Sequence, residues 1–233
     1  MTTLFVGDVH GCAKELASLL KKVRLRPKKD RLLLVGDAFS RGPAPRTVWD
    51  QIEEFRVEMV LGNHDDRLLR QLCRWAEGKD PKFGRPEQRY TFAELVPVVD
   101  QLLPWLHNCP LYIDERKFLM VHAGINPEGG LEATTREEFL HIRTWPATDG
   151  TCGPRWYEYY EPSDQLLVFG HDAPGGVVER RHNPKALPYL IGLDSGCVYG
   201  GKLSGYLLDE DEIVQVKSRR DYAPKGQRQS SAR

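Results

Sequence analysis

Short apolar runs alternate with longer stretches of helical periodicity along the first half of the chain. The runs at 4–6, 32–35 and 57–61 predict strands, and the second is apolar throughout, as expected of a strand buried on both faces. Elsewhere apolar residues recur three and four positions apart, which is typical of helices with one apolar face. Such helices are expected over 16–23, 43–55 and 68–75.

The middle of the chain begins with a charged segment that lacks periodicity. This segment, 74–89, is expected to be a long loop, either functional or without a role. Thr91 and Glu94 then form a capping-box pattern that predicts a helix start, and the helical spacing continues to Leu106. Pro97 is expected to disturb the second turn of that helix because proline cannot donate a backbone hydrogen bond.

The second half predicts more strand than helix. A hairpin is expected over 111–121, a short helix over 135–142, an irregular aromatic stretch over 145–162, a strand over 166–169, and further strands over 188–216. The strand–helix order of the first half favours an α/β fold with a largely parallel sheet and right-handed crossovers. We expect one domain over 1–217, followed by a basic, polar and disordered tail over 218–233.

Composition excludes several function classes. Lys plus Arg and Asp plus Glu each number 33, so the formal net charge is zero and there is no general attraction to nucleic acid or anionic membranes. The apolar runs are too short to span a membrane, and no signal-peptide pattern opens the chain, so a cytoplasmic location is expected. The five cysteines form no C-x-x-C pair and are interpreted as reduced thiols without an assigned function.

Metal-type side chains follow five of the apolar runs, most of them beside a glycine. In α/β sheets such side chains converge beyond the carboxyl ends of the strands, and four of the seven histidines lie at these positions. The remaining three, His107, His141 and His182, are interpreted as surface or structural residues. The six candidate ligands are Asp8, His10, Asp37, Asn63, His122 and His171.

The candidate ligands are more numerous than one tetrahedral ion needs. Two ions could share Asp37, one with Asp8 and His10 and the other with the remaining three ligands. Carboxylate, amide and imidazole groups without thiolate suit divalent transition ions, with Mn²⁺ favoured and Fe²⁺, Zn²⁺ or Co²⁺ as alternatives. Such an ion pair is typical of enzymes that displace groups at phosphorus.

With these segments the chain resembles the calcineurin-like metallophosphoesterases, in particular their phosphoprotein-phosphatase branch. The segments are Gly7-Asp8-Val9-His10-Gly11, Gly36-Asp37-Ala38-Phe39-Ser40-Arg41-Gly42, Gly62-Asn63-His64-Asp65, His122-Ala123-Gly124 and Gly170-His171. The resemblance implies an αββα sandwich of two mixed β-sheets and a dinuclear site with a bridging hydroxide nucleophile. It further implies that His64 is the general acid and that Arg41 and Arg143 grip phosphate oxygens.

Ser40 departs from the protein Ser/Thr phosphatases, which carry an aspartate there to partner the catalytic histidine. Symmetrical bis(5′-nucleosyl)-tetraphosphatases tolerate a small residue, and the segment 192–203, which contains Tyr199, is similar to theirs. This resemblance implies cleavage of dinucleoside polyphosphates, Ap4A to two ADP, with Tyr199 among the substrate-binding residues. The region between His122 and His171 is shorter than is usual in better-known members.

Three alternatives stay open beside the dinucleotide hydrolase. The first is a Ser/Thr or broad-specificity phosphatase acting on other phosphoesters, and the second is a non-catalytic scaffold, against which the complete ligand set speaks. The third is a nuclease, which the Arg41-Gly42 pair and the lack of a large basic patch disfavour. Capped RNA ends are the one nucleic-acid substrate left open, and the sequence does not fix the oligomeric state.

Overall fold

The structure is a computed structural model, and it describes residues 1–147, 150 and 152–224. In chain order its strands and longer helices are β1 (Thr3–Val6), α1 (Ala13–Lys22), β2 (Arg31–Leu34), α2 (Pro45–Phe55), β3 (Glu58–Met59), α3 (Asn63–Ala76), α4 (Pro86–Leu95), α5 (Val99–His107), β4 (Tyr112–Glu115), β5 (Phe118–Val121), α6 (Gly130–Ala133), α7 (Arg136–His141), β6 (Leu166–Phe169), β7 (Val178–Arg181), β8 (Pro188–Gly192), β9 (Lys202–Leu207) and β10 (Glu212–Lys217).

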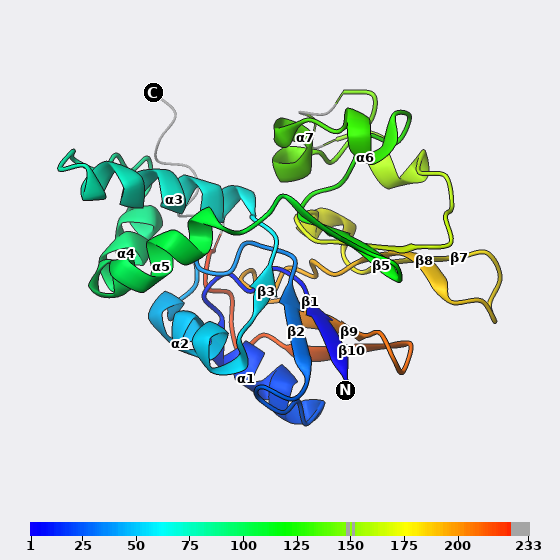
Figure 1. The fold of residues 1–233 in the computed structure, drawn as a ribbon, viewed down its shortest axis with the longest axis horizontal. Coiled ribbons are helices and arrows are strands. Elements are labelled where there is room, and N and C mark those ends of the chain that lie inside the picture. The colour runs from blue at the N-terminus through cyan, green and yellow to red at the C-terminus, as the bar shows by residue number, and fades with distance from the viewer. Residues whose placement is uncertain (148–149, 151, 225–233) are drawn as a thin grey trace.

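The strands form two mixed sheets of five strands each (Figure 1). The first has the order β10-β9-β1-β2-β3 and the second the order β4-β5-β6-β8-β7. The central strands β1, β2 and β3 run parallel, as do β5, β6 and β8, whereas β9, β10, β4 and β7 pair antiparallel with their neighbours. The two mixed sheets implied by the family resemblance are confirmed. The simpler prediction of one largely parallel sheet is wrong. Antiparallel strands β9 and β10 extend the parallel strands of the first sheet on one side, and antiparallel strands β4 and β7 flank those of the second.

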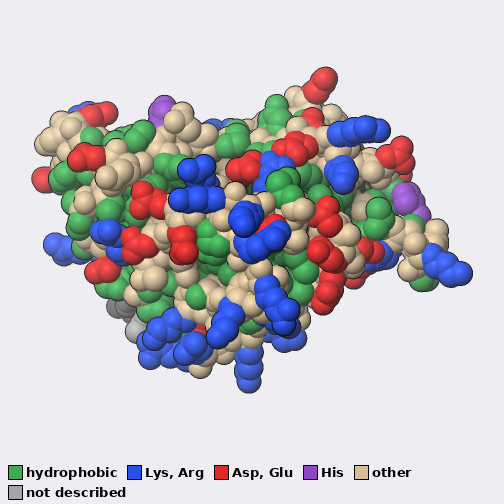
Figure 2. Space-filling view, turned by 60° about the horizontal axis from the view of Figure 1, so that its bottom comes forward, with side chains coloured by type: hydrophobic (Ala, Val, Ile, Leu, Met, Phe, Trp, Pro, Cys, Tyr) green, Lys and Arg blue, Asp and Glu red, His purple; other side chains and the backbone are tan. Residues whose placement is uncertain are grey.

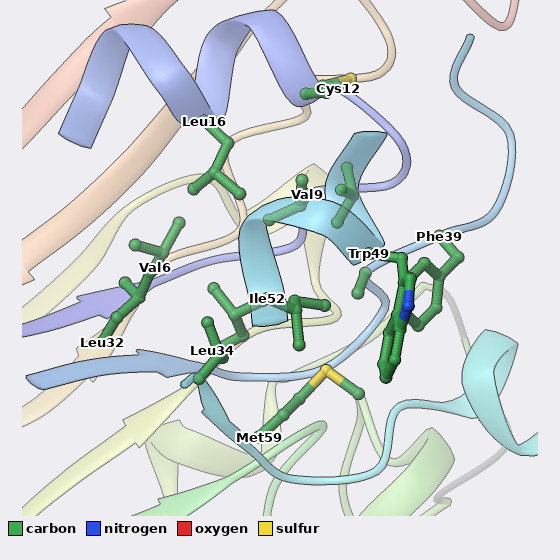
Figure 3. Close-up of a cluster of buried hydrophobic side chains, with 14 of the residues drawn as sticks. Val6, Val9, Cys12, Leu16, Leu32, Leu34, Phe39, Trp49, Ile52 and Met59 are labelled. Atoms are coloured by element: carbon green, nitrogen blue, oxygen red, sulfur yellow. The ribbon is translucent and has the colours of Figure 1, made fainter. Parts of the chain in front are cut away.

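Alternate residues of each strand face different layers, as the two-residue period of a strand requires. Phe5 and Leu33 pack between the two sheets, in a cluster that also holds Phe118 and Val168 of the second sheet. Their neighbours along the strands face the helices instead. Figure 3 shows this helical side of the first sheet, where Val6, Leu32 and Leu34 meet Leu16 of α1 and Ile52 of α2. The outer face of the second sheet is covered by α7 and by the aromatic stretch around Trp156.

Two predicted helix starts differ from the structure. The third helix begins at Asn63 itself, so the ligand segment forms its first turn. The fourth begins at Pro86, five residues before Thr91, because proline fits the first turn of a helix. The Thr91 hydroxyl donates to the carbonyl of Glu87 inside that helix, so the predicted capping box is wrong. A 3-10 turn over Val96–Val98 breaks the helix at Pro97, as predicted.

The packed chain continues past Lys217, where the sequence predicts a tail. The N–H of Ser218 donates to the carbonyl of Gly201, and the N–H of Tyr222 donates to the carbonyl of Val198. Both hydrogen bonds attach this segment to the chain just before β9 of the first sheet. The Tyr222 hydroxyl and the N–H of Arg219 both donate to Glu15, a buried carboxylate of α1 that needs donors. The rest of the predicted tail, 225–233, lies outside the described residues.

The surface carries side chains of both charges, as the zero net charge requires. Figure 2 shows acidic and basic side chains mixed over one face, with Lys and Arg gathered along its lower edge. Within the part of the chain that the structure describes, no helix has both the length and the apolar character needed to cross a membrane.

Candidate metal centre

The six candidate ligands follow strands from both sheets and meet at one place. Asp8 and His10 follow β1, Asp37 follows β2, and Asn63 opens α3 just beyond β3. His122 and His171 follow β5 and β6 of the second sheet. Five of them line a cavity of about 500 Å³, and His122 lies fully buried behind it. The carboxyl ends of the parallel strands therefore build one site from two sheets.

Within the site the ligand atoms form two groups that share Asp37. The first holds Asp8, His10 and Asp37, and the second holds Asp37, His122 and His171, with the ligand atoms of each group within 4.8 Å of one another. Nε2 of His122 lies 3.3 Å from Oδ1 of Asn63, which places the amide beside the second group. This is the division into two overlapping sets that the sequence predicts.

Several of these residues adopt a left-handed backbone. His10 has φ 47°, Asp37 has φ 54° and His171 has φ 66°, values that cost free energy for residues other than glycine. Backbone hydrogen bonds compensate for this cost. The N–H of His10 donates to the carbonyl of Asp37 over 2.8 Å, so the two loops that carry the first ligand group hold each other.

Two glycines allow the loops to approach the carboxylates. A Cβ at Gly170 would collide with Oδ1 of Asp8, and a Cβ at Gly62 would collide with Oδ1 of Asp37. A backbone N–H close to each glycine donates to that same oxygen: His171, the residue after Gly170, donates to Asp8 over 3.0 Å, and His64, two residues after Gly62, donates to Asp37 over 2.9 Å. The glycine beside each ligand is therefore required by close packing.

Hydrogen bonds from behind the site orient two of the imidazoles. Nδ1 of His122 lies 2.8 Å from the carbonyl of Val35, and Nε2 of His171 lies 3.2 Å from the carbonyl of His141. A carbonyl only accepts, so each of these nitrogens carries the proton and the other ring nitrogen keeps its lone pair for the site. His141, which the sequence predicts to be a surface or structural residue, supports a candidate ligand through its backbone carbonyl.

Burial and mutual repulsion shape the electrostatics of the cavity. Burial, with the charges of Asp194 and Asp37, raises the pKa of Asp8 well above its ordinary value. Burial lowers the pKa of His10, His122 and His171, so these rings are neutral near pH 7. A divalent cation would bind the neutral imidazoles and would neutralise the negative charge of the crowded carboxylates. The donor set therefore fits a metal centre.

The four predicted substrate and acid residues line the same cavity. Nη1 of Arg41 lies 3.2 Å from Nε2 of His10, and its guanidinium lies 5.6 Å from the centre of the Tyr199 ring. Nη2 of Arg143 donates to the carbonyl of His171 over 3.1 Å. Burial, with the nearby charge of Arg41, lowers the pKa of His64 to about 3, although Asp37 opposes the shift. His64 is therefore neutral in the free protein at pH 7.

One buried carboxylate of the cavity was missed by the sequence interpretation. Asp194 follows β8, is 5% exposed, and accepts a hydrogen bond from the N–H of Gly196 over 3.0 Å. Burial raises its pKa to about 6. The sequence carries a signal for this residue, because Asp194 follows an apolar run just as Asp37 does. Asp65, also missed, accepts from the N–H of Ala38 next to Asp37.

Comparisons with known proteins agree with this geometry. The family model described as calcineurin-like phosphoesterase matches residues 1–199. A symmetrical bis(5′-nucleosyl)-tetraphosphatase of Serratia proteamaculans is 31% identical over 281 aligned positions, which cover 95% of this chain and 96% of that protein. The alignment is longer than the 233 residues of this chain, so the relative carries insertions.

Solved structures give the same result. A crystal structure provisionally described as a diadenosine tetraphosphatase is similar with a TM-score of 0.73 and 28% identity, covering 93% of each chain. A protein serine/threonine phosphatase from Saccharomyces cerevisiae has a TM-score of 0.53 at 14% identity, covering 97% of this chain and 82% of that one. The latter likeness concerns the fold alone.

Proposed function

Because the chain belongs to the calcineurin-like phosphoesterase family, we propose that it hydrolyses dinucleoside polyphosphates symmetrically, cleaving Ap4A to two ADP. The observation that carries the proposal is the pair of ligand groups that share Asp37 in a cavity lined by Arg41 and Arg143. The names of the similar proteins, a symmetrical bis(5′-nucleosyl)-tetraphosphatase and a diadenosine tetraphosphatase, point to the substrate class.

The first ligand group, with Asp8, His10 and Asp37, would hold one divalent ion. Asp37 with Asn63, His122 and His171 would hold the second. Bound there, two such ions would lower the pKa of a water and neutralise phosphate charge. We propose Mn²⁺ as the native metal, with Fe²⁺, Zn²⁺ and Co²⁺ as alternatives, since the donors are oxygen and imidazole nitrogen without thiolate.

The two arginines of the cavity would bind and orient the polyphosphate. Arg41 stands beside the first ligand group and Arg143 beside His171 of the second, so the two guanidinium groups approach the site from different segments. A guanidinium can donate two parallel hydrogen bonds to phosphate oxygens, which fixes orientation as well as charge. The scissile phosphate would therefore be held between them.

His64 would donate a proton to the oxygen that leaves with the ADP product. Its ring centre lies 5.2 Å from that of His10, at the edge of the first ligand group. The low pKa of His64 in the free protein means that it must gain its proton in the substrate complex. The negative charges of a bound tetraphosphate favour the protonated ring and would raise that pKa. Tyr199, on the cavity wall, would contact the nucleoside.

Location and partners complete the proposal. All five cysteines are free, with Cys12 and Cys197 buried, and reduced thiols are typical of the cytoplasm. We therefore propose a cytoplasmic enzyme that acts on free nucleotides rather than on membranes or nucleic acid, with capped RNA ends as the one exception left open.

The proposal is tested by incubating the protein with Ap4A and Mn²⁺ and separating the products. ADP as the only product is expected, and the variant Asp37→Ala, which lacks the shared ligand, should release none. ATP plus AMP would contradict symmetrical cleavage. Intact Ap4A, together with phosphate release from a phosphopeptide, would replace the proposal by a protein phosphatase. No activity on either substrate, with no bound transition metal, would favour the scaffold.

A further inference from the structure

A second cavity lies beside the metal centre and shares two side chains with it. It has a volume of about 140 Å³, and Arg41 and Tyr199 line both cavities. Its other walls come from Arg85, Glu87 and the segment 222–224. A ligand group bound on Arg41 therefore has direct access to the metal centre on one side and to this smaller cavity on the other.

The aromatic wall of the smaller cavity is held firmly. The N–H of Tyr222 donates to the carbonyl of Val198 over 2.9 Å, next to Tyr199, and its hydroxyl donates to Glu15 over 2.9 Å. Tyr199 itself forms a β-bridge with Asp221. Three segments that are distant in sequence are thus tied together, as expected of a built cavity rather than an accidental gap between loops.

The side chains of this cavity match a nucleotide. Arg41 and Arg85 offer guanidinium groups, which bind phosphate oxygens in pairs of hydrogen bonds. Tyr199 and Tyr222 offer phenol rings, on which nucleobases stack. A phosphate alone would use only the arginines, and an apolar ligand would use neither guanidinium group. Nη1 of Arg85 lies 3.9 Å from Oε1 of Glu87, and this ion pair is partly exposed, so a phosphate would compete with that carboxylate for Arg85. A nucleoside diphosphate uses both kinds of group.

We infer that the smaller cavity is the subsite for one nucleoside diphosphate half of the substrate, an inference that rests on the proposed function. The phosphate next to the scissile bond binds Arg41, the phosphate attached to the ribose binds Arg85, and the base lies against Tyr222. Hydrolysis breaks the central bridging P–O bond. The oxygen of the attacking water bonds to one phosphorus, and a proton is added to the bridging oxygen, which leaves with the other ADP. Because Arg41 and Arg85 bind the two phosphates of one half, the bond placed at the metal centre is the one between the two halves, and cleavage is symmetrical.

The inference is tested with Arg85→Ala against Arg89→Ala, which removes the same charge from the same segment but outside the cavity. KM is measured for Ap4A and for p-nitrophenyl phosphate, which has neither base nor second phosphate. Arg85→Ala should raise the KM for Ap4A relative to the KM for p-nitrophenyl phosphate about 10-fold or more, the effect expected from loss of a charge-assisted hydrogen bond. Arg89→Ala should leave this ratio unchanged. An unchanged ratio in Arg85→Ala would overturn the inference.

A binding measurement tests the subsite even if the protein does not cleave Ap4A. If the wild-type protein releases no ADP from Ap4A, the dissociation constants of ADP and inorganic phosphate are measured by calorimetry with Mn²⁺ present. A lower Kd for ADP than for phosphate, raised about 10-fold by Arg85→Ala and not by Arg89→Ala, would support the subsite alone. Equal Kd values for ADP and phosphate in the wild type would overturn it.

The aromatic wall is tested with Tyr222→Phe against Tyr222→Leu. Both variants lose the hydroxyl that reaches Glu15, but only the first keeps a ring. The Kd for ADP should be about 5-fold or more higher in the leucine variant, in the range of base stacking on an aromatic side chain. Equal ADP affinity in two folded variants would overturn the placement of the base.

Discussion

The backbone N–H of His171 donates to Oδ1 of Asp8 over 3.0 Å, although 163 positions separate the two residues. Asp8 follows β1 in the first sheet and His171 follows β6 in the second. This bond therefore joins the two sheets at the metal centre, and it ties one residue of the first ligand group to one of the second. The fold and the site depend on the same contact.

Asp8→Asn and Asp8→Ala separate the charge of Asp8 from this hydrogen bond. The asparagine oxygen can still accept from His171, whereas alanine leaves a buried N–H without an acceptor, at a cost of about 1–3 kcal/mol. In EDTA, urea unfolding should therefore show Asp8→Ala to be less stable than Asp8→Asn. Both variants should lose roughly 10²-fold or more of the activity with Mn²⁺, because both lack a charged ligand. Equal stability would show that the bond does not hold the sheets together.

His64→Asn should lower kcat on Ap4A by roughly 10²- to 10⁴-fold, the usual range for loss of a general acid. The loss should be smaller with p-nitrophenyl phosphate, whose leaving group departs without a proton. His107→Asn, a change at an exposed histidine of α5, serves as the control. An equal loss on both substrates would assign His64 a structural role instead.

The pH profile tests the same assignment. Burial and Arg41 lower the pKa of His64 to about 3 in the free protein. Because the reacting form carries the proton, kcat/KM, which reports the free enzyme, should fall steadily between about pH 5 and 8 without a midpoint from His64. The profile of kcat, which reports the substrate complex, should fall at alkaline pH as the protonated ring is lost. The same alkaline fall in His64→Asn would contradict this origin.

Ser40→Ala should keep turnover within roughly fivefold of wild type, a change of under about 1 kcal/mol in the barrier. Ser40 is buried and lines a small cavity with His64 and Arg67, so its hydroxyl is near the proposed acid. Attack by water needs no serine nucleophile, and no phosphoprotein should be trapped on acid quenching. A folded but inactive Ser40→Ala protein would favour a covalent route.

The ligand positions could be predicted because each has a local signal. An apolar run that ends in glycine and a metal-type side chain is visible at Asp37 and His171 without knowledge of the fold. Sheet membership has no such signal. β1 pairs with β9, whose residues lie about 200 positions later, and that antiparallel pairing turns the expected parallel sheet into a mixed one.

Residues placed by long-range contacts were predicted less well. Asp194 has the same local signal as Asp37, but that it reaches the cavity follows from the pairing of β8 with β6 in the second sheet, which the sequence pattern does not specify. The segment at Tyr222 is polar and basic in sequence, yet a buried carboxylate on α1 fixes it. The predicted start of α4 is wrong because Pro86 and Thr91 are competing local signals, and the helix begins at the proline, which fits its first turn.

Asp194→Asn should change how the stability of the metal-free protein depends on pH. Burial raises the pKa of Asp194 from 3.8 to about 6, so between these values the folded protein holds a proton that the unfolded chain has released. Its contribution to stability therefore falls as pH rises through this window. In EDTA the variant should gain roughly 1–3 kcal/mol relative to wild type between about pH 4 and pH 7.

The measurement is urea unfolding at several pH values, with and without Mn²⁺. The buried histidines have lowered pKa values and act in the opposite direction, but they are present in both proteins and should largely cancel in the difference. Mn²⁺ should stabilise the wild type more than the variant, because the cation neutralises the carboxylate. A difference that stays flat with pH would contradict the titration of Asp194.

Tyr222→Phe should destabilise the protein although it removes one oxygen near the end of the described chain. The hydroxyl donates to Oε1 of Glu15 over 2.9 Å, and the N–H of Arg219 donates to the same oxygen over 3.0 Å. Glu15 is only 2% exposed, so loss of a donor leaves a buried carboxylate less well satisfied, at about 1–3 kcal/mol.

Tyr160→Phe is the matched control, because its hydroxyl pairs with Ser163 in an exposed contact. Its cost should stay within about 0.5 kcal/mol, as for other exposed substitutions. In a double-mutant cycle, Glu15→Gln and Tyr222→Phe should show a coupling of about 0.5–3 kcal/mol, since the two side chains are in direct contact. If both tyrosine variants unfold at the wild-type urea concentration, the segment after Lys217 does not stabilise the domain, and the tail predicted from the sequence would begin there after all.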